Sequence, residues 1–132
     1  MEELIRAARQ ALDGAYAPYS SFSVGAAVLA DDGTIYQGCN IENASYGLTM
    51  CAERTAIYSA VAAGCRRLQA IAVVAATQGP ASPCGACRQV MAEFGINRVI
   101  MANTAGSVRE ASLAELLPFA FSEDDMAGAK HD

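Results

Sequence analysis

The chain has 132 residues, of which 53% are hydrophobic and 17% are charged, and its 9 basic and 14 acidic residues leave a net charge of −5. This acidic balance argues against a nucleic-acid groove, because affinity for phosphates comes mainly from clustered lysine and arginine. The sole lysine and the sole histidine are Lys130 and His131. Their place at the C-terminal end disfavours P-loop enzymes, Schiff-base enzymes and histidine-based nucleophile pairs.

The first half of the chain predicts a helix, a hairpin and a loop. Apolar residues recur at helical spacing over residues 2–13, which is typical of an amphipathic helix. Two β-prone runs, 22–30 and 34–41, are joined by Asp31-Asp32-Gly33. The Asp-Gly pair supplies the positive φ angles of a tight hairpin turn. The polar residues that follow, up to Thr49, predict a loop.

The second half of the chain alternates helices and strands. Helices are expected over 51–63 and 84–94, each ended by a glycine, and from the capping box at Ser112 to just before Pro118. Runs of Ile, Val and Ala predict strands over 68–76 and 98–102, and residues 107–111 could form another. Strands separated by helices form βαβ crossovers, so we expect a single α/β domain over residues 1–132, with a mixed sheet and helices packed on its faces.

Five cysteines remain to be explained: Cys39, Cys51, Cys65, Cys84 and Cys87. Their odd number and an acidic N-terminus without an apolar run argue against a disulfide framework and a signal peptide. The longest aliphatic stretch is too short to cross a bilayer. We therefore expect a cytoplasmic protein with reduced thiols and no membrane association. Reduced cysteines are either small core residues or metal ligands, and their spacing in the sequence distinguishes these two roles.

The spacing of three cysteines predicts a zinc site. Cys84 and Cys87 form a C-x-x-C pair at the start of a helix, where both sulfur atoms can reach one metal. A third thiolate from Cys51 would complete a three-cysteine site with an open fourth position, which is the arrangement of a catalytic zinc. Helix N-termini also favour the thiolate form.

Glu53 and two arginines stand beside these ligands in the sequence. Glu53 can face the same metal as Cys51 only if the pocket lies beyond the helix end, and there it can take a proton from the zinc-bound water. Arg54 and Arg88 can offset the negative charge of three thiolates, and we expect Arg54 to contact them.

Two other interpretations of the cysteines stay open. A C-x-x-C at a strand-to-helix junction also fits a thioredoxin-like redox pair, which would leave the Cys51-x-Glu53 pair without a role. A closed structural zinc site could take Cys39 or Cys65 as its fourth ligand, which would leave Glu53 without a role. In the catalytic-zinc interpretation, Cys39 and Cys65 are small buried apolar residues without a role.

Beyond the motifs themselves, the sequence resembles the small zinc-dependent cytidine deaminases. The segments CAERTA, from Cys51, and PCGACRQ, from Pro83, are similar to the two zinc motifs of that family. The resemblance continues over nearly the whole chain, through segments 15–22, 38–46 and 116–121. The zinc motifs alone indicate a superfamily that also acts on dCMP, guanine, tRNA or blasticidin, and the further matches favour the nucleoside enzymes.

The resemblance implies hydrolytic deamination of cytidine and deoxycytidine to the uridines, with release of ammonia, in pyrimidine salvage. It implies one Zn²⁺ per chain on Cys51, Cys84 and Cys87, which activates water for attack on the ring, with Glu53 as the proton shuttle. The implied fold is a three-layer α/β/α cytidine-deaminase-like fold with a mixed five-stranded sheet. The implied assembly is a homotetramer with shared active sites.

The resemblance also assigns contacts to a small-molecule nucleoside, with no nucleic-acid partner. Asn40 and Glu42 would hold the ribose hydroxyls, and Phe22 would line the base pocket with a backbone group of Ala52. Further contacts, two of them across a subunit boundary, are expected from Ala44, Tyr46 and Phe121, the last stacking on the pyrimidine. Phe119 stands where the resemblance leads us to expect a small residue.

Overall fold

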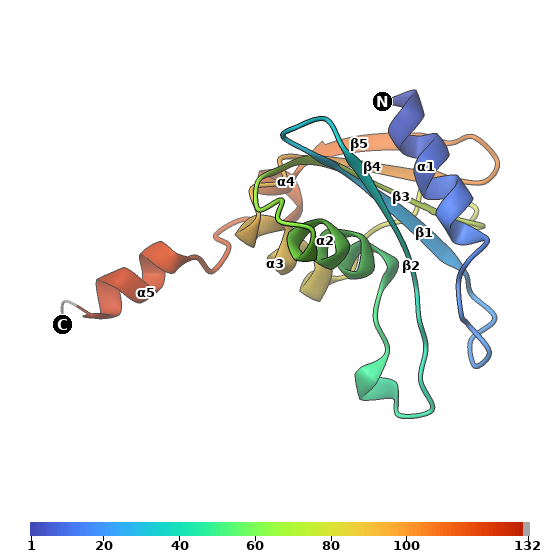
Figure 1. Cartoon of the computed structure of the whole chain (residues 1–132), viewed down its shortest axis with the longest axis horizontal. Coiled ribbons are helices and arrows are strands. Elements are labelled where there is room, and N and C mark those ends of the chain that lie inside the picture. Colours follow the sequence, from blue (N-terminus) through green and yellow to red (C-terminus); the bar gives the residue numbers. More distant parts are fainter. Residues whose placement is uncertain (131–132) are drawn as a thin grey trace.

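In the computed structural model, which describes residues 1–130 and the side chains of residues 1–126, a five-stranded sheet carries helices on both faces (Figure 1). His131 lies outside the described residues. The strands are β1 (Val24–Ala30), β2 (Ile35–Cys39), β3 (Leu68–Ala75), β4 (Arg98–Asn103) and β5 (Val108–Ser112). The α-helices are α1 (Glu2–Leu12), α2 (Ala52–Ala62), α3 (Gly85–Glu93), α4 (Leu113–Leu116) and α5 (Glu123–Lys130). A short 3-10 turn, η1, covers Tyr46–Leu48.

The sheet is mixed, as predicted. Its strand order is β2-β1-β3-β4-β5, and among the described strands β3 and β4, which α3 connects, are the only neighbours that run parallel. The optional strand over 107–111 is present as β5. The helix α5 was not expected from the sequence, and Figure 1 shows it projecting away from the layered body. Among the described residues, no helix has both the length and the apolar character needed to span a membrane.

The layers form a three-layer sandwich, which confirms the expected fold class. The helix α1 packs on one face of the sheet, and α2 packs on the other face and contacts α3 (Figure 1). Two glycines bring helices and sheet close together. A Cβ atom at Gly25 would lie 2.0 Å from the carbonyl oxygen of Ala8 in α1, and one at Gly38 would lie 2.3 Å from the backbone nitrogen of Ala56 in α2. Glycine is therefore required at both contacts.

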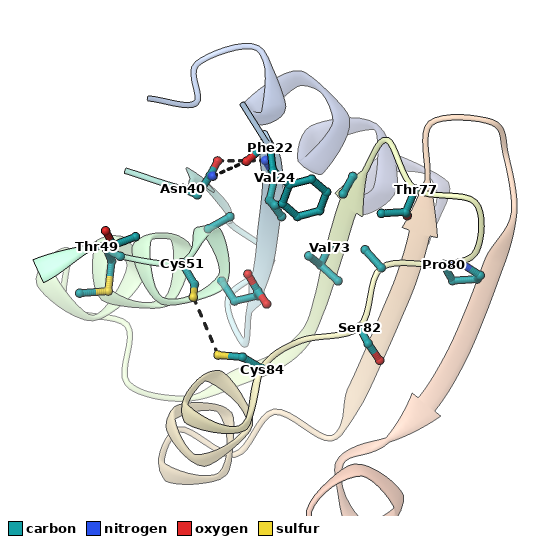
Figure 2. Close-up of a pocket in the computed structure, with 15 residues that line it drawn as sticks. Phe22, Val24, Asn40, Thr49, Cys51, Val73, Thr77, Pro80, Ser82 and Cys84 are labelled. Atoms are coloured by element: carbon teal, nitrogen blue, oxygen red, sulfur yellow. Dashed lines mark hydrogen bonds between the residues drawn. The ribbon is translucent and has the colours of Figure 1, made fainter. Parts of the chain in front are cut away.

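The close packing of α2 determines where the chemistry-bearing residues lie. The N-termini of α2 and α3 both lie beside the carboxyl end of β3, from which the chain continues into the loop before α3 (Figure 2). Ligand sites in α/β sheets form outside the carboxyl ends of the strands.

Candidate metal centre

Three thiols from the starts of α2 and α3 meet at this end of the sheet. The sulfur atoms of Cys51, Cys84 and Cys87 all lie within 4.8 Å of one another. The Cys51 and Cys84 sulfurs are 3.8 Å apart and face each other in Figure 2, and the Cys84 and Cys87 sulfurs are 3.3 Å apart. The structure therefore brings together the three cysteines that the spacing singled out.

Local backbone geometry explains this convergence. Cys51 and Cys84 are the residues directly before the first turns of α2 and α3, and both have extended backbone angles. The backbone N–H of Cys87 donates to the Cys84 sulfur at 3.4 Å, so the first turn of α3 turns both thiols of the C-x-x-C pair to one side. Unpaired N–H groups and the positive end of the helix dipole stabilise thiolates at such positions.

The donor set suits zinc. Ligands on tetrahedral Zn²⁺ with Zn–S bonds of about 2.3 Å lie roughly 3.8 Å apart, close to the sulfur separations observed here. Cys39 and Cys65 do not join the group: the Cys39 thiol donates to the carbonyl of Gly14, and the Cys65 sulfur lies 3.3 Å from the Tyr36 hydroxyl. Among the described residues, the cluster thus has three cysteine ligands and no cysteine for a fourth position.

Arg54, the residue expected beside the thiolates, contacts one of the three cysteines. Its guanidinium donates to the Cys51 sulfur at 3.4 Å. Hydrogen bonding from Cys87, and then from Arg54, lowers the pKa of the Cys51 thiol to about 5. The Nε atom of Arg54 is buried and has no hydrogen-bond partner among the described residues.

Arg88, the second positive charge beside the cysteine motifs, is hydrogen-bonded to backbone carbonyls. It donates from Nε to the carbonyl of Pro83 at 3.0 Å and from Nη1 to the carbonyl of Leu116 at 2.8 Å. Its neighbour Gln89 donates to the carbonyl of Phe121 at 2.8 Å. Both side chains of α3 therefore tether the C-terminal segment to the helix that carries Cys87.

Glu53 lies in the first turn of α2 and is 5% exposed. Burial, with a smaller contribution from the neighbouring Cys51 thiolate, raises the pKa of its carboxyl group to about 7. A carboxyl group with a pKa near neutrality can both accept and release a proton. This is the property required of a general acid–base group.

A cavity of about 420 Å³ opens in front of the cluster (Figure 2). Six of the residues expected at the site line it: Phe22, Asn40, Cys51, Ala52, Glu53 and Cys84. Cys87 is fully buried beside it. The rest of the wall was not expected from the sequence. It comes from the start of β1, from β3 and from the segments that precede the two cysteine motifs: Val24, Thr49, Met50, Val73, Ala75, Thr77, Pro80, Ala81 and Ser82. For Ala75 and the loop residues that follow it, the signal was their place at the carboxyl end of β3, which pairs in parallel with β4.

The two residues expected to hold ribose are already hydrogen-bonded within the chain. The Asn40 side chain accepts from the N–H of Val24 at 2.9 Å and donates to the carbonyl of Phe22 at 2.7 Å. Glu42 lies outside the main cavity and lines a smaller pocket of about 230 Å³ with Tyr19, Ser20, Tyr46 and Thr49. Thr49 lines both pockets, so the two adjoin.

The remaining expected contacts are not gathered by this chain alone. Tyr46 lines the small pocket, where its ring meets the Tyr19 ring edge to face, yet 76% of it is exposed. Ala44 and Phe121 are exposed and line neither pocket within the described part of the chain. Phe119, where the resemblance led us to expect a small residue, has a φ of 55°, a left-handed conformation that favours glycine.

Comparisons with known proteins agree with this geometry. Residues 1–103 match the family model described as the cytidine and deoxycytidylate deaminase zinc-binding region. The chain is 56% identical over 131 residues to a cytidine deaminase of Sporosarcina psychrophila, covering 98% of this chain and 96% of that one. The crystal structure of cytidine deaminase from Burkholderia pseudomallei matches 91% of this chain and 98% of its own, with a TM-score of 0.88 and 56% identity. That of the Mycobacterium tuberculosis enzyme matches 92% and 96%, with a TM-score of 0.80 and 45% identity.

Proposed function

The chain belongs to the cytidine and deoxycytidylate deaminase family, and on that premise we propose that it is a zinc-dependent hydrolase that deaminates cytidine and deoxycytidine. The products are the uridines and ammonia. The observation that carries the proposal is the meeting of three thiols and a buried carboxyl group, Glu53, at one cavity. The redox and structural-zinc alternatives leave the placement of Glu53 in that cavity without a purpose.

Zinc on Cys51, Cys84 and Cys87 would supply a Lewis acid that lowers the pKa of a water molecule. The chain's own residues compensate the charge of the site and move the protons. Arg54 offsets part of the negative charge of the thiolates through its hydrogen bond to Cys51. Glu53 accepts a proton from water, transfers it to the ring nitrogen of the base, and then assists the departure of ammonia. Burial raises the pKa of the Glu53 carboxyl group to about 7, so the group can both take up and release a proton near neutral pH.

The cavity wall suits a planar base attached to a sugar. Apolar groups of Phe22, Val73 and Ala75 face the base and exclude water, and the backbone of Ala52 meets its polar edge. Asn40 and Glu42 offer an amide and a carboxylate toward the ribose hydroxyls. Ala44 and Tyr46 contribute further substrate contacts, and Phe121 stacks on the pyrimidine.

We further propose that residues 1–132 form one catalytic domain that assembles into a homotetramer. Tyr46 and Phe121 support this, because they are exposed and would complete the site of a neighbouring copy. The five free thiols suit a cytoplasmic location, and the substrate class suits pyrimidine salvage.

Loss of cytidine ultraviolet absorbance, followed with purified protein, tests the proposal directly. We expect turnover of cytidine and deoxycytidine, with little competition from dCMP, CMP or blasticidin. Metal analysis should find one zinc per chain, and removal of zinc by a chelator should abolish activity, which returns when zinc is restored. A protein that keeps its activity without zinc, or that does not deaminate cytidine, would refute the assignment.

A further inference from the structure

Ser20 connects residues on the two sides of the nucleoside site. Its hydroxyl donates to Oε2 of Glu42 and accepts from the backbone N–H of Phe22 at 3.0 Å. The N–H groups of Tyr19 and Ser20 donate to Oε1 of Glu42 at 2.9 and 3.0 Å. One hydroxyl thus joins the residue proposed for the base pocket to the residue proposed for the sugar.

These hydrogen bonds hold Glu42 as an anion in one orientation. The hydrogen bond from the Ser20 side chain, followed by the two backbone N–H groups, keeps the pKa of Glu42 below its ordinary value. Oε1 is occupied by two donors, whereas Oε2 receives one hydroxyl and can still accept another. A sugar hydroxyl is therefore expected to meet Oε2, the oxygen that Ser20 holds.

The same loop is anchored from its other end. The Asn40 amide holds the carbonyl of Phe22 and the N–H of Val24. Ser21, between the two anchors, has a φ of 58°. A loop with an unfavourable backbone angle needs such anchors to keep one conformation.

We propose that Ser20 is a positioning residue for the sugar: its hydroxyl orients Glu42 for the ribose hydroxyls and sets the distance between Glu42 and Phe22. This inference rests on the proposed function, and it concerns a side chain that makes no contact with the reacting atoms. Its loss should weaken binding of the sugar and leave the proton transfer by Glu53 intact.

The test compares Ser20→Ala with Ser20→Thr and with Ser21→Ala. Thr retains the hydroxyl, and Ser21 is the matched control, since it is exposed in the same loop and its hydroxyl has no hydrogen-bond partner among the described residues. For Ser20→Ala we expect KM for cytidine to rise by about tenfold with kcat within about twofold of the parent, as for loss of one charge-assisted hydrogen bond. Ser20→Thr should restore much of the affinity, and Ser21→Ala should resemble the parent.

Two further measurements show whether the effect passes through Glu42. Dideoxycytidine lacks both ring hydroxyls, so its inhibition constant against cytidine should be nearly the same for Ser20→Ala and the parent. In a Glu42→Gln background, Ser20→Ala should add little to KM, because coupled residues are not additive.

Equal losses for cytidine and dideoxycytidine, a fall in kcat alone, or an unchanged KM would each overturn the inference. Since Ser20 is exposed, the melting temperature of Ser20→Ala should stay near that of the parent. A parent protein without cytidine deaminase activity would instead overturn the proposed function, so the two failures are distinct.

Discussion

At the scale of single residues, the site depends on one buried carboxyl group beside three thiols. Glu53 is nearly enclosed by protein, and burial is the main reason for its raised pKa. On the surface of a helix, a first-turn glutamate would only stabilise the helix dipole. Its buried position in the first turn of α2, beside Cys51, instead gives the carboxyl group the raised pKa that the proposed proton transfer requires.

Glu53→Gln tests that role. Glutamine has nearly the same shape and cannot exchange a proton, so kcat should fall by at least about 100-fold, the usual contribution of general acid–base catalysis. Zinc content, measured on the same sample, should remain at one per chain. Glu93→Gln, an exposed glutamate at the end of α3, serves as the control and should keep parental kcat. A zinc-loaded Glu53→Gln protein with near-normal kcat would contradict the proton-shuttle role.

Phe119 combines an unfavourable backbone angle with an exposed side chain. Phe119 has a φ of 55° and a fully exposed side chain, 105% relative to the reference state. A left-handed conformation costs a residue with a Cβ about 1–2 kcal/mol, and the greater chain entropy of glycine offsets about half of this. Phe119→Gly should therefore raise the free energy of unfolding by about 0.5–1 kcal/mol in chemical denaturation.

Phe119→Ala separates strain from loss of the ring, because alanine keeps the Cβ atom. Only the glycine variant should gain stability. If both variants lose stability, the ring is covered in solution, and strain at Phe119 is not the dominant effect.

At the scale of elements, the short distance between helix α2 and the sheet depends on a glycine, Gly38, which has no Cβ atom. Gly38 on β2 lets the backbone of α2 approach so closely that an added Cβ would lie 2.3 Å from the nitrogen of Ala56 and 2.7 Å from the carbonyl oxygen of Ala52. Both neighbours are backbone atoms, so a small side-chain movement cannot relieve the contact. Because Cys51 directly precedes α2 and Glu53 lies in its first turn, the distance of α2 from the sheet also fixes the metal site.

Gly38→Ala should lower the free energy of unfolding by about 3 kcal/mol, the upper part of the range for overpacked cores. It should also reduce zinc content, since α2 must move outward. Gly79→Ala is the control: a Cβ there meets nothing within 4 Å, and its φ is not positive. If the two variants have equal melting temperatures and zinc contents, the close contact does not position α2.

Elements with strong local signals were predictable from the sequence, and contacts between distant segments were not. The helices that follow both cysteine motifs and the capping box at Ser112 and Glu115 are confirmed. The zinc cluster was predictable because both motifs stand at helix starts. The partners of Arg88 and Glu42 were not, because Leu116 and Ser20 lie 28 and 22 residues away in the chain. The helix α5 was missed because it follows Pro118 and lacks an apolar face of its own.

At the scale of the whole molecule, one copy leaves aromatic and apolar side chains uncovered near its site. Tyr46, Leu48 and Phe121 are each at least 60% exposed. Gln89 holds the carbonyl of Phe121, which fixes the backbone of this residue while its ring stays outside the chain's own cavity. Large apolar groups that are held in place and exposed are typical of surfaces that meet another chain.

Phe121→Ala should lower kcat/KM for cytidine by about tenfold, the value expected for loss of one aromatic stack. If the ring acts in a neighbouring copy, co-expression of Phe121→Ala with Glu53→Gln should recover activity beyond the sum of the two separate variants. In the mixed assembly, some sites combine an intact Glu53 from one chain with an intact Phe121 from the other. Purification through two different affinity tags isolates the mixed assemblies for the rate measurement. An unchanged kcat/KM for Phe121→Ala would exclude stacking, and a mixed assembly without recovery would place Phe121 and Glu53 in the site of the same chain.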